Sequence, residues 1–113
     1  MKKLCACLLL LVLCSSAWAQ EKHPACDGPD NWAAAMAGAY LKNKGLTQIA
    51  GGFDSVLVNR LASEPLGKGL FNQVHTVLIQ QGEKTFTLIT VNIASFEECS
   101  ASEVDVYLVQ PLN

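Results

Sequence analysis

The chain is poor in charged and aromatic side chains, and it lacks the motifs that mark small enzymes and metal sites. Of its 113 residues, 16% are charged and 7% are aromatic. Neither a G-x-S-x-G nucleophile motif nor an H-E-x-x-H metal motif occurs. We therefore expect a protein that is not an enzyme and that has no bound metal or other cofactor.

Basic residues are scarce as well. The chain has 8 Lys and Arg against 10 Asp and Glu, and the basic residues form no stripe or cluster outside the first positions. Proteins that bind nucleic acids need such a basic surface, because it displaces counterions from the phosphates. Nucleic acid is therefore not an expected partner.

The N-terminus has the composition of a secretory leader. Two lysines precede an apolar run from Leu4 to Leu13, and a small-x-small cleavage site ends at Ala19. The run is shorter than the roughly 18 residues that a transmembrane helix needs. The sequence thus predicts a signal peptide over residues 1–19 and a single exported α+β domain over residues 20–113. We expect the domain to be periplasmic or secreted, without a stable membrane anchor after cleavage.

Three of the 5 cysteines would leave with this leader, so that Cys26 and Cys99 remain. Two cysteines in an exported chain usually form one disulfide, and the entropy of closing so long a loop would stabilise the fold by about 4 kcal/mol. A zinc site is the weaker interpretation, because the two cysteines and the distant His23 do not have the spacing of zinc ligands.

The stretch from Leu70 to Phe96 predicts a β-hairpin, because Val, Ile, Thr and Phe dominate both halves and Gly82-Glu83 suits a type II′ turn between them. This turn would place Gln81 opposite Lys84, which fixes the register and therefore the two faces. One face would carry Gln73, His75, Val77 and Ile79 opposite Asn92, Thr90, Leu88 and Phe86. The other would carry Asn72, Val74, Thr76 and Leu78 opposite Ile93, Val91, Ile89 and Thr87.

The remaining elements flank this hairpin. A helix is predicted from Asn31 to Lys44, since Trp32, Met36 and Tyr40 recur at helical spacing beside an arc of smaller apolar residues. Strands are predicted over 53–62 and 103–110, the latter from strict alternation of apolar and other residues.

This element order predicts an α+β fold in which one N-terminal helix packs on a four-stranded antiparallel meander sheet. The one predicted disulfide would link the two ends of this domain. The layout is similar to the cystatin-like arrangement of a helix cradled by an antiparallel sheet, and also to several small periplasmic inhibitor and immunity proteins. The similarity lies in element order. Where a cystatin has a Gln-x-Val-x-Gly hairpin, this chain has Gln73-Val74-His75 without the glycine, so no cystatin residue is transferred.

A single helix covers only one face of the hairpin, and both faces are partly apolar. If the helix covers Val74, Ile89, Val91 and Ile93, the other face is left open to a partner. The residues predicted to bind a partner protein are then Phe86, Leu88, Val77, Ile79 and, at the polar edge, His75. A homodimer through the same exposed face is also possible.

These features predict a protein-binding domain that acts as an inhibitor or immunity-type factor by occupying a partner protein. One alternative is a small-molecule or lipid carrier that uses the cavity between helix and sheet. Another is a small hydrolase that uses His75, oriented by Asp54 or Glu64. An acidic group near the C-terminus could steer a basic partner, or could be only a solvated turn. It comprises Glu97, Glu98, Glu103 and Asp105.

Overall fold

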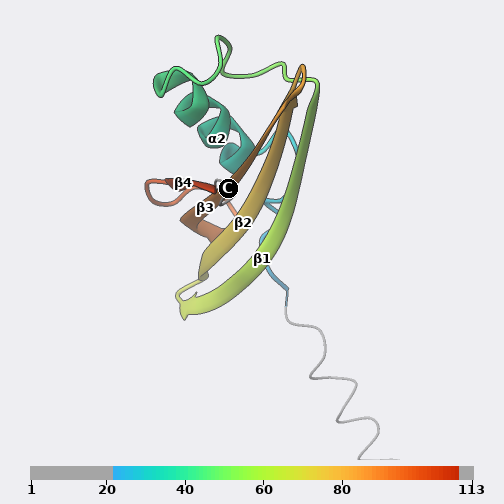
Figure 1. The fold of residues 1–113 in the computed structure, drawn as a ribbon. Coiled ribbons are helices and arrows are strands. Elements are labelled where there is room, and N and C mark those ends of the chain that lie inside the picture. The colour runs from blue at the N-terminus through green and yellow to red at the C-terminus, as the bar shows by residue number, and fades with distance from the viewer. Residues whose placement is uncertain (1–21, 110–113) are drawn as a thin grey trace, which may run out of the picture.

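The computed structural model describes residues 22–109 and shows one helix packed against one face of an antiparallel sheet (Figure 1). The elements are α2 (Trp32–Asn43), β1 (Ser55–Gly67), β2 (Leu70–Gln81), β3 (Lys84–Ser95) and β4 (Asp105–Val109). The strands lie in the sheet in their order along the chain. The predicted α+β class, the meander and the disulfide are confirmed. The predicted signal peptide over residues 1–19 lies outside the described residues.

The central hairpin has the predicted register. Gln81 is paired with Lys84, and the pairing continues without a shift to Leu70 and Ser95. Gly82 has a φ of 62°, the positive value that the first central residue of a type II′ turn requires. Local turn chemistry and alternation were therefore sufficient to place every residue of this hairpin against its partner.

The two edge strands differ more from their predicted bounds. β1 continues past Ala62 to Gly67, with register shifts between Arg60 and Ala62 and between Pro65 and Gly67. A proline is tolerated there because an edge strand leaves one row of N–H groups unpaired. β4 comprises Asp105–Val109 and so begins two residues later than predicted, and position 110 lies outside the described residues.

Helix α2 faces the sheet with small side chains. Its buried residues are Ala33, Ala34, Ala37, Gly38 and Leu41. Trp32, which was predicted to lie on the packed arc, is 47% exposed. A Cβ at Gly38 would collide with the carbonyl oxygen of Ala50 in the connector to β1. Close approach of the connector and the sheet thus selects small residues on this side of the helix, and the larger ones lie at its margin.

The helix covers the face of the sheet that carries the predicted partner-binding residues, so the condition under which those residues would be exposed is not met. We call the covered side the inner face. Val77, Ile79 and Leu88 on it are fully buried, and Phe86 packs against them. On the opposite side, which we call the outer face, the side chains predicted to be covered are only half-buried. These are Val74, Ile89, Val91 and Ile93.

Two segments outside the hairpin cover the polar end of the inner face and allow this face to be buried. Residues 22–26, which we call the N-terminal strap, are joined to the β3–β4 loop by the disulfide between Cys26 and Cys99, 73 positions apart. The Gln73 amide donates a hydrogen bond to the Pro24 carbonyl at 3.0 Å, and the Asn92 amide donates one to the Cys99 carbonyl. These backbone acceptors allow the inner face to bury polar side chains that alone would favour solvent.

No helix within residues 22–109 has the length and apolar character that crossing a membrane requires.

The assignment of the faces predicts opposite outcomes for two valines of β2. Val77→Asp places an unpaired carboxylate in the core and should lower the free energy of unfolding by about 4 kcal/mol or more. Val74→Asp on the outer face should lower the free energy of unfolding by only about 1 kcal/mol, which is the range over which residues differ in their preference for a strand. Urea denaturation of both variants measures this difference. A stable Val77→Asp protein beside an unfolded Val74→Asp protein would reverse the assignment.

The disulfide predicts coupled loosening of two distant segments. Replacing Cys26 and Cys99 together by serine should reduce the free energy of unfolding by about 4 kcal/mol, the loop-closure entropy for a loop of this length. Amide hydrogen exchange should rise both in the N-terminal strap and in residues 96–104, while the centre of the hairpin stays protected. Faster exchange in only one of the two segments would show that the strap does not depend on the disulfide.

Candidate functional site

The outer face of the sheet is a continuous surface of mostly apolar side chains. The strand register places them in cross-strand rows, in which neighbouring Cβ atoms are about 5 Å apart. One row comprises Leu57, Leu78, Thr87 and Val109, the next Asn59, Thr76, Ile89 and Tyr107, and the third Ala62, Val74, Val91 and Asp105. Alternation in each strand produces this arrangement, because every second residue points away from the helix.

The largest side chains of this surface are exposed on its two edge strands. Leu57 and Leu61 in β1 are 54% and 60% exposed, and Tyr107 and Val109 in β4 are 56% and 43% exposed. The strands between them contribute half-buried valine, leucine and isoleucine. An uncovered apolar patch rimmed by polar groups is typical of a surface that binds another protein.

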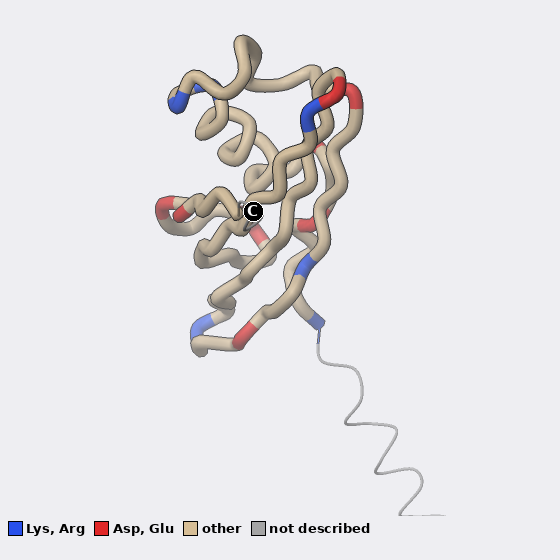
Figure 2. The backbone as a smooth tube through the Cα atoms, in the orientation of Figure 1, with Lys and Arg blue, Asp and Glu red and all other residues tan. Residues whose placement is uncertain are grey.

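Charge is confined to the rim of this face. In the register of the described strands its only charged side chains are Glu64, opposite Asn72, and Asp105, opposite Val91. Further acidic residues occupy the loop between β3 and β4, which lies beside β4 (Figure 2). These are Glu97, Glu98 and Glu103, all exposed. In the described strands the outer face therefore carries acidic side chains and no basic one, whereas Lys68 lies beyond it in the β1–β2 turn and Arg60 belongs to the inner side of β1.

The inner face carries a second unusual feature, a cluster of four buried polar side chains. Gln73 lies opposite Asn92 in the ladder and His75 lies opposite Thr90, and none of the four is more than 4% exposed. The Gln73 and Asn92 side-chain oxygens, the Thr90 hydroxyl and both ring nitrogens of His75 have no hydrogen-bond partner among the described residues. Groups of this kind cost about 1–3 kcal/mol each when they are left unsatisfied, so this cluster opposes part of the stability that the surrounding apolar core provides.

The position of His75 disfavours the charged form of its ring. Burial disfavours the charged imidazolium and lowers the pKa of His75 below its ordinary value; the carboxylate of Asp27 raises it, and the Arg60 guanidinium lowers it further. The ring is fully buried. It therefore lies within the packed core, where it does not present a nitrogen to solvent.

The structure does not bring His75 together with the carboxylates that could orient it. Asp54 accepts a hydrogen bond from the Gly82 amide at 2.7 Å, at the hairpin tip, and Glu64 lies on the outer face. Within residues 22–109 there is also no group of three or more His, Cys, Asp or Glu side chains that could hold a metal ion.

The residues predicted to bind a partner are brought together, but in the core. Val77, Ile79, Leu88 and Phe86 pack with the helix, and His75 lies beside them on the inner face. Sequence reasoning missed the exposed residues of the edge strands, although the alternation in β4 already placed Tyr107 and Val109 on one face. What it lacked was the knowledge of which face the helix covers.

Comparison of the chain with known protein families, with curated proteins and with solved structures found no match. The cystatin-like layout therefore remains a prediction.

The buried histidine predicts that the protein loses stability in mild acid. Above a pH of about 6.5, the ordinary pKa of histidine, His75 is neutral in both the folded and the unfolded chain. As the pH falls below this value, the unfolded chain takes up a proton that the folded protein resists, so the free energy of unfolding decreases until the lowered pKa is passed.

Denaturation curves between pH 7.5 and about 5 test this by comparing the protein with His75→Leu, which cannot take up the proton. The variant should show a clearly smaller loss of stability over this range. Equal losses in the two proteins would mean that His75 can be protonated in the folded state.

Proposed function

We propose that this protein is an exported binding domain that acts by occupying a partner protein, as an inhibitor or immunity-type factor does. The observation that carries the proposal is the outer face: a four-stranded apolar surface that no described element covers, exposing Leu57, Leu61, Tyr107 and Val109. The site lies on the side of the sheet opposite to the face first predicted to bind.

Two further features support the exported, binding character. The disulfide between Cys26 and Cys99 requires an oxidising compartment, as the periplasm or the extracellular space provides. The disulfide and the paired strands also make a scaffold whose binding face is formed before the partner arrives. A preformed surface loses little conformational entropy on binding, which favours affinity.

The charge distribution indicates the chemistry of the partner. The outer face has an acidic rim and, among the described residues, no basic side chain within it. We therefore propose a partner surface with an apolar centre flanked by Lys or Arg, because complementary charge speeds the encounter and fixes its orientation. A second copy of this chain would offer the same acidic rim and no opposite charge.

A photo-crosslinking residue at position 107, introduced into the full chain in its native cells, tests the proposal first. We expect one predominant crosslinked protein at position 107 and none at position 32, which begins α2 on the covered side of the sheet. No crosslink from the outer face, or the same product from both positions, would overturn the proposal. A crosslink to a second copy would replace the proposed partner by a homodimer.

Affinity measurements with the purified partner then use two exposed apolar residues on opposite sides of the sheet. Leu57→Asp removes an outer-face anchor and should weaken binding at least about 30-fold, the effect of losing an interface hot spot. Trp32→Asp in α2, on the covered side of the sheet, is the control, since Trp32 is 47% and Leu57 54% exposed, and it should change affinity by no more than about twofold. Equal effects of the two substitutions would exclude the outer face as the binding site.

A further inference from the structure

The two cysteines of the disulfide differ in their access to solvent. Cys26 is only 3% exposed, whereas Cys99 is half-buried and lines a hollow of about 330 Å³ at the surface. The other described residues that line this hollow are Trp32, Glu98 and Ser100. Thiols break a disulfide by direct attack on one of its sulfurs, so the rate depends on which sulfur they can reach. In this protein that sulfur belongs to Cys99.

Apart from the disulfide, a few side-chain contacts hold the N-terminal strap. The Pro24 carbonyl accepts hydrogen bonds from the Gln73 amide at 3.0 Å and from the Arg60 guanidinium at 3.1 Å. The His23 ring and the Ser63 hydroxyl form a hydrogen bond of 2.7 Å. Within residues 22–109, no hydrogen bond between backbone groups joins the strap to the sheet or to a loop. The strap therefore depends on its covalent link for much of its attachment.

The polar side chains at this end of the inner face gain hydration when the strap opens. The oxygens of Gln73, Thr90 and Asn92 and both ring nitrogens of His75 lack hydrogen-bond partners among the described residues, and water does not reach them in the closed form. Opening would let water bond to these groups, which offsets part of the contacts that the strap loses. An apolar surface in the same place would gain nothing from exposure.

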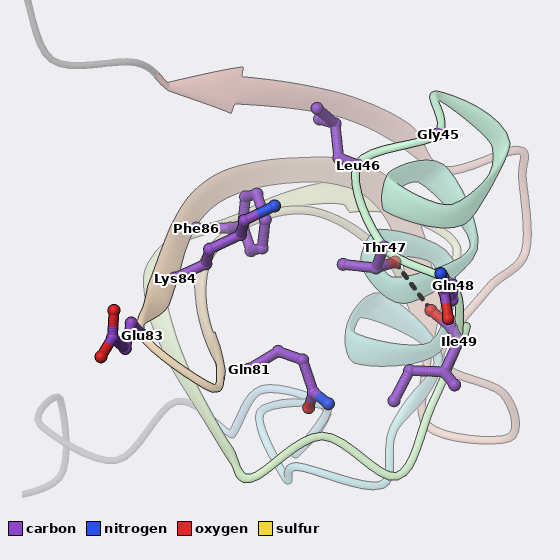
Figure 3. Close-up of a pocket in the computed structure, with 9 residues that line it drawn as sticks. All are labelled: Gly45, Leu46, Thr47, Gln48, Ile49, Gln81, Glu83, Lys84 and Phe86. Atoms are coloured by element: carbon purple, nitrogen blue, oxygen red, sulfur yellow. Dashed lines mark hydrogen bonds between the residues drawn. The ribbon is translucent and has the colours of Figure 1, made fainter.

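The apolar core is built without the strap. Its buried cluster comes from α2 and from strands β1 to β3, and none of its members belongs to residues 22–26. Leu46 and Phe86 extend this core to the hairpin tip (Figure 3). Loss of the disulfide therefore removes no apolar contact of the cluster, and the strap can detach from a sheet that stays folded.

We propose that the disulfide is a redox switch: a dithiol reduces it by attack at Cys99, and the N-terminal strap then detaches and opens the polar end of the inner face. This brief exchange does not depend on the complex at the outer face, and either proposal can fail without the other.

The exchange has two steps. A thiolate of the dithiol attacks Sγ of Cys99 and forms a mixed disulfide there, while the bond to Cys26 breaks and Cys26 leaves with the electron pair as a thiolate. The second thiol of the reductant then attacks the mixed disulfide and releases Cys99. The dithiol is oxidised to a disulfide, both cysteines are reduced, and two protons pass through solvent from the reductant to the cysteine thiolates.

The site of attack is tested on the full chain with its disulfide intact and without denaturant. Brief reaction with 2-mercaptoethanol, followed by N-ethylmaleimide and peptide mass mapping, shows which cysteine carries the mixed disulfide. We expect it on Cys99, with the maleimide on Cys26, at least about fivefold more often than the reverse. Attack at Cys26 as frequent as at Cys99, or no reaction of the folded protein, would overturn the proposal.

Two neighbouring glutamates provide a matched pair of variants for the route of attack. Both Glu97 and Glu98 are exposed, but only Glu98 lines the hollow beside Cys99. Glu98→Phe should slow the reaction at least about fivefold by obstructing access to the sulfur, and Glu97→Phe, which removes the same charge, should change the rate by no more than about twofold. Equal rates in the two variants would exclude the hollow as the route and contradict the proposal.

Opening is measured by NMR on the full chain before and after reduction with dithiothreitol. Amide exchange in the strap should become at least about tenfold faster, while the amides of Val77 and Leu88 stay protected. In the closed form burial lowers the pKa of His75, with Asp27 raising it and Arg60 lowering it further. Hydration of the ring in the open form should raise this pKa toward its ordinary value. Loss of protection throughout the hairpin, or an unchanged pKa of His75, would show that the disulfide is only a structural link and overturn the proposal.

Discussion

Packing of helix α2 on the inner face of the sheet is the contact on which the rest of the structure depends. Residues 22–109 contain one helix for a four-stranded sheet, and this helix covers one of the two faces. The alanines of α2 and Gly38 let the helix and its connector approach closely, and Leu41, Val77, Ile79 and Leu88 fill the space between. Burial of these side chains supplies the main driving force for folding. The opposite face remains in contact with solvent as a direct consequence.

The covalent strap extends this core over residues that an apolar interior alone would not accept. The disulfide between Cys26 and Cys99 holds the strap and the β3–β4 loop across the polar end of the inner face. There the Pro24 carbonyl accepts a hydrogen bond from Gln73, and the Cys99 carbonyl accepts one from Asn92. His75 is enclosed in the same region, and its ring has no hydrogen-bond partner within residues 22–109. Because the disulfide holds the segments that cover these polar groups, we expect the fold to be sensitive to both reduction and acid.

Local signals were enough to predict the class of fold, the disulfide and the whole register of the central hairpin. Gly82 fixed the turn, and the alternation that follows from it paired each residue of β2 with the correct residue of β3. The choice of the covered face could not be predicted in this way, because both faces combine branched apolar residues with polar ones. The carbonyls of Pro24 and Cys99, which accept hydrogen bonds from Gln73 and Asn92 on the covered face, lie outside the hairpin and are not part of its pattern. The apolar residues predicted to bind a partner consequently lie in the core, and the exposure of Leu57 and Leu61 on the edge strand was not foreseen.

We propose that the sheet has a closed inner face and an open outer face that a partner protein covers. Methyl NMR with a soluble paramagnetic agent measures this directly in the folded protein. Strong relaxation is expected for the methyl groups of Leu57, Leu61 and Val109, and weak relaxation for those of Val77, Ile79 and Leu88. Addition of the partner should protect the first set and leave the second unchanged. Strong relaxation at Val77, Ile79 and Leu88, or outer-face methyl groups that remain accessible in the complex, would contradict the claim.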